Sequence, residues 1–329
     1  MLVIKPTTEE VESVEIPDTP FFGRLSARMG ESTLRKRLAV ERILLERMAP
    51  RFRSANGMAD RRVQVRALDF ALRVSGLAGR ARRNFEQIRL VRKKWEIEGL
   101  DRDLSGLRIL HVSDFHLDFD PGLLSRLREA LRGVEYDLAC LTGDFFDLIF
   151  EEDSIKAQWL DDLIGLFRGP VFAVLGNHDI LAVADHLERL GVSVLMNEGQ
   201  PFGPNGRGLW IAGVDDPRLF ESDSMESALR GRPPGAPVLL LAHSPQAYQE
   251  ASLHNVDFMM SGHTHGGQVS LPWFVPFTSR FRCPQKMASG AWRHGRLQGY
   301  TSNGCGGSKL AYRLNAPAEI ALHTIFPHS

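Results

Sequence analysis

The sequence predicts an α/β fold preceded by a helical segment, and three observations support this prediction. The composition is that of an ordinary globular chain, with 43% hydrophobic and 24% charged residues among 329. Residues 24–85 carry helical patterns, whereas from about residue 88 short apolar runs alternate with helical ones. Such alternation is typical of an α/β sheet whose strands are mostly buried.

The amino-terminal residues are expected to form an arm followed by helices. Residues 1–20 are acidic and contain three prolines, which favours a loose arm. The run from Arg35 to Met48 is continuously helical and ends at Pro50. In the next run one helical face collects the apolar residues Val63, Ala67, Phe70, Ala71, Val74 and Ala78. We therefore predict a helical N-terminal extension over residues 1–87 and a second domain over residues 88–329.

Within the second domain the elements follow one another in a regular order. Strands are predicted at Leu107–Val112, Tyr136–Thr142, Val171–Leu175, Leu209–Val214, Val238–Ala242, Phe258–Ser261 and Ile320–Ile325. Helices are predicted between them at Leu123–Arg132, Ile155–Phe167 and Leu181–Leu190.

Charge is distributed unevenly along the chain. Residues 1–100 carry 21 basic and 13 acidic side chains, a net charge of +8, and the rest of the chain carries −8. Residues 20–95 alone carry 20 basic and 6 acidic side chains, a net charge of +14. The second predicted helix contains Arg61, Arg62, Arg66 and Arg73.

Two interpretations of this basic segment remain open. The arginines form a solvated face on helices that pack against the main domain, or they bind an anionic partner such as acidic lipid headgroups. Nucleic acid is the less favoured partner, because no recognition motif accompanies the charge and the acidic domain would repel a long polyanion.

The sequence also bears on the compartment. The amino terminus does not resemble a secretion signal, and no stretch approaches the roughly 18 uncharged apolar residues of a membrane span. The three cysteines, Cys140, Cys283 and Cys305, make no disulfide framework and fit a reducing compartment. We therefore expect a cytoplasmic protein that is soluble or attached to the inner face of the cell membrane.

Five of the predicted strands are followed directly by residues of the types that bind metal ions. These residues are Asp114 and His116, Asp144, Asn177 and His178, His243, and His263 and His265. In open α/β sheets a site forms beyond the carboxyl ends of the strands, so residues far apart in the sequence can converge there.

The residue types suit the hydrolysis of a phosphoester. Two metal ions roughly 3.5–4 Å apart acidify a water molecule and neutralise the phosphate. Such a pair needs imidazole and carboxylate ligands, including one carboxylate able to bridge the ions. The spacings Asp114-x-His116 and His263-x-His265 place both side chains on one side of a strand exit. Glycines precede Asp144 and two other candidate ligands, and we expect them to permit the unusual dihedrals of tight turns.

Other residues near these blocks are secondary candidates. Asp147 and Asp179 are expected to stand behind the ligands and orient histidines. The segment Asn303–Gly307 is expected to be a turn lining the site, because no Lys-Ser/Thr pair follows its glycines as in a phosphate-binding loop. An aromatic group is interpreted as core or as a loop that contacts a lipid or a base: Trp273, Phe274, Phe277 and Phe281.

Together the blocks resemble the calcineurin-like metallophosphoesterase superfamily, whose pattern is D-x-H, G-D, G-N-H-[DE], H and G-H-x-H. That pattern stands here as Asp114/His116, Gly143/Asp144, Gly176–Asp179, His243 and Gly262–His265. The resemblance covers roughly residues 88–327. It implies a four-layer fold, in which a two-sheet β-sandwich is flanked by helices.

The same resemblance implies a role for each residue. It implies that the first metal ion is bound by Asp114, His116, Asp144 and His265. It implies that the second is bound by Asp144, Asn177, His243 and His263, with Asp144 bridging. His178 would donate a proton to the leaving oxygen or steady the phosphate. No block is broken, so we expect an active enzyme.

Further segments resemble one bacterial branch, the membrane-associated phosphodiesterases that include UDP-2,3-diacylglucosamine diphosphatases. The segments are Gly262–Val269, Gly213–Asp216, Leu241–Pro245, Ser302–Gly306 and Pro317–Ile320. We therefore expect hydrolysis of a phosphodiester or diphosphate bond, with a UDP-diacylglucosamine-type lipid precursor at the membrane surface as the finer expectation. Manganese is the first choice of metal, and iron or zinc fits the same ligands. The alternatives are a nuclease or cyclic-nucleotide phosphodiesterase, and a non-catalytic scaffold that binds a partner through its basic helices.

Overall fold

Two six-stranded sheets form the centre of the molecule. The computed structural model describes residues 5–48, 66–147, 154–204, 208–271, 275–276, 282–308 and 310–328. The first sheet has the order β1 (Arg89–Ile97), β14 (Glu319–Pro327), β2 (Leu107–Val112), β3 (Leu138–Leu141), β4 (Val171–Ala173) and β5 (Ser193–Val194). The second has the order β12 (Gly290–His294), β13 (Leu297–Thr301), β9 (Phe258–Ser261), β8 (Val238–Leu241), β7 (Leu209–Gly213) and β6 (Glu198–Phe202).

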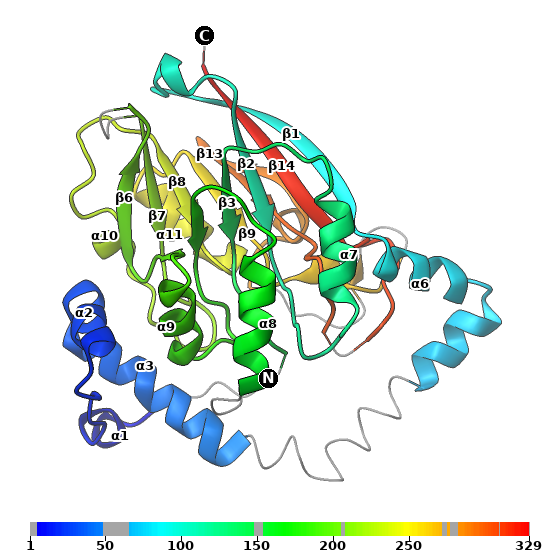
Figure 1. Cartoon of the computed structure of the whole chain (residues 1–329), viewed down its shortest axis with the longest axis horizontal. Coiled ribbons are helices and arrows are strands. Elements are labelled where there is room, and N and C mark those ends of the chain that lie inside the picture. The colour runs from blue at the N-terminus through cyan, green and yellow to red at the C-terminus, as the bar shows by residue number, and fades with distance from the viewer. Residues whose placement is uncertain are drawn as a thin grey trace.

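The strands that carry the candidate ligands run side by side in parallel. In the first sheet β2 pairs with β3 and β3 with β4, and in the second β7 pairs with β8 and β8 with β9, all parallel. Their carboxyl ends therefore point in one direction within each sheet (Figure 1). A short antiparallel pair, β10 (Ser270–Leu271) and β11 (Val275–Pro276), follows the last ligand block.

Apolar side chains between the two sheets hold them together. Alternate residues of β2 and β3, such as Ile109 and Cys140, meet Leu239 and Met260 of the second sheet, and all four are buried. This alternation follows from the period of two in a strand, which sends successive side chains to opposite faces of the sheet. Cys140 thus packs as a small apolar residue, as its sequence context indicates.

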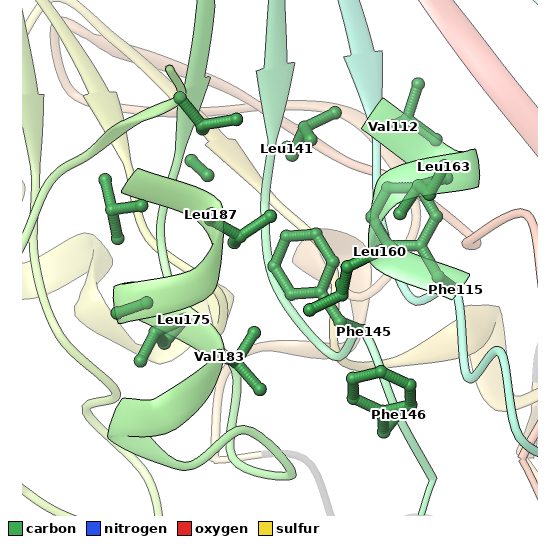
Figure 2. Close-up of a cluster of buried hydrophobic side chains, with 14 of the residues drawn as sticks. Val112, Phe115, Leu141, Phe145, Phe146, Leu160, Leu163, Leu175, Val183 and Leu187 are labelled. Atoms are coloured by element: carbon green, nitrogen blue, oxygen red, sulfur yellow. The ribbon is translucent and has the colours of Figure 1, made fainter. Parts of the chain in front are cut away.

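Helices cover the outer face of each sheet and complete four layers. The first sheet carries α7 (Leu123–Ala130), α8 (Ser154–Ile164) and α9 (Leu181–Arg189), whose leucines share one apolar cluster with the strand residues Val112 and Leu141. Figure 2 shows part of this cluster, with Leu163 of α8 and Leu187 of α9. The second sheet carries α10 (Met225–Ala228) and α11 (Tyr248–Leu253). The predicted α/β class and the layered sandwich are therefore confirmed.

Short 3₁₀ turns complete the connections between these elements. They span Arg102–Leu104, Pro245–Ala247, His265–Gly267 and Gln285–Met287. Among the described helices, none combines the length and the apolar character that crossing a lipid bilayer requires.

The N-terminal helices α1 (Thr8–Glu12), α2 (Pro20–Met29) and α3 (Glu31–Ile43) lie against this body, with a π-helical turn at Leu44–Met48 after them. Leu25 and Leu34 are fully buried and belong to the same apolar cluster as the leucines of α7, α8 and α9. Burial of one such leucine contributes roughly 1.5–3 kcal/mol. Helices α2 and α3 therefore pack on the core of the sheets, and the division of the chain into an extension over residues 1–87 and a second domain stays a prediction.

The described part of the second predicted helical run turns its apolar residues outward, unlike α2 and α3. Residues 66–74 are helical and are followed by α6 (Ala78–Glu86), on the other side of the molecule from α1–α3 (Figure 1). Leu68 and Leu72 face Val269 and Leu314, whereas Phe70 is 69% exposed and Val74 72% exposed. The predicted apolar face is thus the exposed face. Val63, Arg61 and Arg62 lie outside the described residues.

Sequence patterns missed several strands of both sheets. The strand β1 reads Arg-Leu-Val-Arg-Lys-Lys-Trp-Glu-Ile, and its basic residues hide it from an apolar-run criterion. It is an edge strand with one paired neighbour, β14, so outward charges cost little there. The strands β6 and β12 were also missed, because none of the residues of β6 and only Trp292 of β12 is buried, so neither strand carries an apolar run.

Candidate metal centre

A buried group of four side chains forms at the carboxyl ends of β2, β3 and β9. These are Asp114, His116, Asp144 and His265, and their ligand atoms lie within 4.8 Å of one another. The Nε2 atoms of His116 and His265 are 3.1 Å apart, and His265 Nε2 is 3.3 Å from Asp114 Oδ1. His116 Nε2 is 3.6 Å from Asp144 Oδ2. The four residues come from three strand exits, two in the first sheet and one in the second.

A second group shares Asp144 with the first. It contains His243 and His263, again within 4.8 Å, with Asn177 beside them. His243 Nε2 lies 3.3 Å from Asp144 Oδ2, 3.2 Å from Asn177 Oδ1 and 3.2 Å from His263 Nδ1. All seven predicted ligands are therefore brought together. Their individual roles as ligands stay predictions.

The backbone at these residues is unusual. Asp114, His116, Asp144, His263 and His265 all have positive φ, between 47° and 70°. Residues other than glycine rarely adopt this region, and such conformations concentrate at functional sites.

The glycines before the ligands serve two different needs. The predicted unusual dihedral is confirmed at Gly143, whose φ is +85°. At Gly176 and Gly262 the dihedral is ordinary, and the requirement is space. A Cβ there would overlap the Asp144 carboxylate in the first case and Ser113 in the second.

Backbone carbonyls fix the orientation of two histidine rings in the centre. Nδ1 of His116 lies 3.2 Å from Phe146 O, and Nδ1 of His243 lies 2.6 Å from Thr142 O. A carbonyl only accepts, so each Nδ1 donates and each Nε2 faces the centre. His243 Nε2 lies 3.2 Å from Asn177 Oδ1 and 3.3 Å from Asp144 Oδ2, and both of these oxygens are acceptors. They need a positive group beside them, either a proton on Nε2 or a bound cation.

The electrostatics of the centre also favour a cation. Burial opposes protonation of His243, but the neighbouring Asp144 and Asp114 carboxylates raise its pKa to about 10. Burial lowers the pKa of His116 and His265, so these rings are neutral, the form that binds metal. Burial also raises the pKa of Asp114 to about 6. The carboxylates thus favour positive charge at the centre, which a proton on His243 or a bound cation would supply.

His178 and Asp147 lie beside the first group. His178 is half-buried, and its Nδ1 donates to the backbone oxygen of Asp147 over 2.6 Å. The ring of His178 meets the His116 ring edge-on, with 5.3 Å between centroids. Asp147 Oδ1 lies 3.5 Å from His116 Nδ1 and accepts from Ser308 Oγ. Asp147 therefore stands behind the histidines, as expected, and orients His178 through its main chain.

Asp179 is buried, but it does not contact a histidine ring as its expected role requires. Its carboxylate accepts three backbone N–H groups, those of Asp144, Phe145 and Gly176, each at 2.8 Å. These bonds hold the turn that carries Asp144 next to the turn that follows β4. Burial raises the pKa of Asp179 to about 6 despite these bonds. Its role is therefore to hold the backbone of the predicted bridging residue.

Sequence reasoning missed Arg313, which is fully buried behind His265. Its guanidinium donates to Asn303 O at 2.7 Å and to Gly306 O at 2.6 Å, and lies 3.2 Å from His265 Nδ1. The tail Asn303–Gly307 is thereby held at the site, where Gly306 N donates to Asp114 O. The prediction that this segment is a site-lining turn is confirmed. The predicted aromatic group at 273–281 lies outside the described residues.

With the geometry established, comparison with known proteins identifies the family. The calcineurin-like phosphoesterase family profile matches residues 107–267, which include all seven candidate ligands. The chain belongs to this family. Its phosphoesterase domain therefore accounts for the two-sheet fold and for the shared position of the ligand blocks.

Curated relatives cover the same part of the chain. YpbG of Bacillus subtilis is 32% identical, with 67% of this chain and 81% of that protein aligned. The phosphodiesterase YaeI of Escherichia coli is 29% identical over 65% of this chain and 80% of that protein. A metallophosphoesterase of Helicobacter pylori is 28% identical over 70% of this chain. The alignment spans only 62% of the length of that relative.

Proposed function

We propose that the chain is a dinuclear metal-dependent hydrolase of phosphodiester or diphosphate bonds. The observation that supports this most is the pair of buried ligand groups that share Asp144. A shared carboxylate is what two ions a few ångströms apart require. Membership of the phosphoesterase family and the name of the relative YaeI point to the same chemistry.

The donor set fits two divalent ions. Asp114, His116, Asp144 and His265 would hold one, and Asp144, Asn177, His243 and His263 would hold the other. When bound, the pair supplies positive charge to the phosphoryl group and lowers the pKa of a water molecule. Nitrogen and oxygen ligands suit manganese, our first choice, as well as iron and zinc.

His178 is proposed to act on the leaving group. Its Nδ1 is occupied by the Asp147 carbonyl, so Nε2 is the ring atom that can hold a proton and pass it to the departing oxygen. Its partial exposure leaves room for a substrate, whereas His116 and His243 are fully buried. The bond to Asp147 keeps the ring aligned during the reaction.

Metal analysis and parallel assays test the proposal. After loading with manganese, elemental analysis should find about two ions per chain. The loaded protein should hydrolyse bis-p-nitrophenyl phosphate or a UDP-linked lipid faster than p-nitrophenyl phosphate, and Asp144→Asn should bind neither ion firmly. A chain that stays near zero metal under all loading conditions contradicts the proposal.

The finer proposal is a lipid-linked substrate at an anionic membrane surface. Phe70 and Val74 lie one turn apart on residues 66–74, and both are exposed. The described residues 66–86 contain five arginines, all exposed, against Asp69 and Glu86. An exposed apolar ridge among basic residues complements acidic headgroups, and each basic residue near such a surface contributes about 1 kcal/mol. The opposite side of this helix packs on Val269, four residues after the ligand His265.

Vesicle co-sedimentation tests this surface. The protein should bind phosphatidylglycerol vesicles but not phosphatidylcholine vesicles, and the binding should weaken with salt because the attraction is screened. Phe70→Glu should abolish binding. The matched control is Leu253→Glu, since Leu253 is 74% exposed on α11. Binding to duplex DNA or RNA in place of vesicles, or equal loss in both variants, contradicts the membrane proposal.

A further inference from the structure

The helix α3 inserts a charged side chain into the interior close to the metal centre. Arg37 is fully buried, and its Nη2 donates to the backbone oxygen of Asp179 over 2.7 Å. Its Nε lies 3.0 Å from Asp215 Oδ2 and its Nη1 lies 3.3 Å from Glu41 Oε1. The guanidinium stacks over the Phe220 ring, 3.0 Å from its centroid. The two carboxylate contacts are ionic and poorly aligned, so the aligned hydrogen bond is the one to Asp179.

One turn further along α3, Glu41 contacts the end of the loop that contains Asp179. Its Oε1 accepts from the backbone N–H of Leu181 over 2.9 Å. Leu181 is the first residue of α9, whose N-cap residue Ile180 provides no side-chain cap. The first N–H groups of a helix have no acceptor within the helix, and Glu41 supplies an acceptor for the N–H of Leu181. Arg37 and Glu41 therefore bind this loop at two points, the carbonyl of Asp179 and the N–H of Leu181.

The residue between these contacts and the metal centre is Asp179. Its carbonyl is bound by Arg37, while its carboxylate binds the backbone of Asp144, Phe145 and Gly176. The same loop places the N–H of His178 3.0 Å from Asp144 Oδ1. A continuous set of contacts thus joins α3 to the carboxylate shared by both ligand groups. Arg37 and Glu41 lie outside the family-matched part of the chain, which begins at residue 107.

We propose that Arg37 is a positioning residue for the metal centre, acting from α3 through Asp179 on Asp144. The inference rests on the proposed metal-dependent function. Partners that stand behind metal ligands typically change metal affinity 10- to 100-fold when they are altered. Arg37 lies one residue further away, so we expect an effect at the lower end of that range. Both ions are affected, because Asp144 belongs to both groups.

Arg37→Lys tests the proposal with Arg28→Gln as a matched control. Lysine keeps the charge but lacks the fork that reaches Asp179 and both carboxylates. Arg28 joins α2 to Glu188 at the opposite end of α9 and to Glu198, far from Asp179 in the contact set. Manganese affinity is measured by titration calorimetry, and metal-free and metal-loaded melting temperatures are measured alongside.

Both variants should lower the melting temperature of the metal-free protein. Arg37→Lys should also raise the manganese Kd about 10-fold and shrink the metal-induced rise in melting temperature, while Arg28→Gln leaves both unchanged. Wild-type Kd in Arg37→Lys overturns this inference alone. A wild-type chain that binds no metal overturns the proposed function as well.

A second variant covers the case in which Arg37→Lys does not fold. The combination Arg37→Met, Glu41→Gln and Asp215→Asn removes the arginine without leaving a buried carboxylate unpaired, a change that would otherwise be strongly destabilising. It still leaves the Asp179 carbonyl without its donor. The same rise in manganese Kd is expected, and an unchanged Kd overturns the proposal.

Discussion

The metal centre and the helices α2 and α3 both contain buried polar side chains, but for different reasons. In the centre, His243 Nε2 faces the acceptors Asn177 Oδ1 and Asp144 Oδ2, and Asp144 has a positive φ. In α3, Arg37 donates one aligned hydrogen bond to Asp179 and pairs ionically with Asp215 and Glu41. The first arrangement gathers acceptors around a position that suits a cation, whereas in the second the cation is a side chain of the protein itself. Buried polar groups therefore have to be sorted by whether the chain supplies the charge that balances them.

The largest expected effect tests the functional side of this comparison. His178→Ala should lower turnover of a small diester by about 10²–10⁴-fold, the usual contribution of a general acid. Stability should change less than in a core variant, because the ring of His178 is only half-buried. Steady-state kinetics and metal analysis are the measurements. Loss of both metal ions in this variant would show that His178 is a ligand.

The second prediction tests the structural side. Leu34 on α3 is fully buried among the residues of the core, so Leu34→Ala should reduce the free energy of unfolding by about 2–5 kcal/mol. Turnover per folded molecule should be unchanged at a temperature where the variant is native. Urea unfolding followed by fluorescence measures the first quantity. A loss below about 0.5 kcal/mol, the usual range for surface sites, would mean that α3 is not part of the core.

The sequence predicted the two regions unequally well. The candidate ligands could be predicted because residue type and position are both local: Asp114, Asp144 and His263 each follow an apolar strand, and such strands run parallel within each sheet. The partners of Asp179 could not be predicted, because they are backbone N–H groups of a kind that nearly every residue carries. A charged side chain such as Arg37, with Glu41 one turn later, looks the same in sequence whether it is an exposed pair or a buried one.

Helical periodicity has a similar limit. It shows which residues share a face but not which face meets the protein. Phe70 and Val74 lie on the more apolar face of their helix, yet Leu68 and Leu72 make the contacts to Val269 and Leu314. Tertiary partners decide between the two faces.

The third prediction concerns pH and a pair of buried histidines between the sheets. Burial lowers the pKa of His111 to about 3, and His323 is lowered for the same reason. The unfolded chain has the ordinary histidine pKa near 6.5, so below that pH it binds protons that the folded state does not. Stability is therefore full above pH 6.5 and falls as the pH drops toward 3, by about 1.4 kcal/mol per pH unit for each histidine.

Unfolding by urea at pH 7 and pH 5 measures this slope. His111→Asn can keep the hydrogen bond to Thr142 and should flatten the slope, although it lowers stability at pH 7. His328→Asn is the control, since His328 is exposed at the end of β14, and should leave the slope unchanged. An equally steep slope in His111→Asn would assign the acid sensitivity to other groups.

The smallest expected effect separates the two faces of residues 66–74. Phe70→Ser should change the free energy of unfolding by less than about 0.5 kcal/mol, because the ring is 69% exposed and loses few contacts. Leu72→Ala, two residues away on the packed face, removes a side chain that is 4% exposed and should cost about 2–4 kcal/mol. The pair shares one helix, so helix propensity and position in the chain cannot explain a difference between them. Equal losses in the two variants would mean that Phe70 is covered in solution, and the ridge proposed to meet the membrane would then be unavailable. A near-zero loss for Phe70→Ser together with lost vesicle binding would show that this ring serves a partner and not the fold.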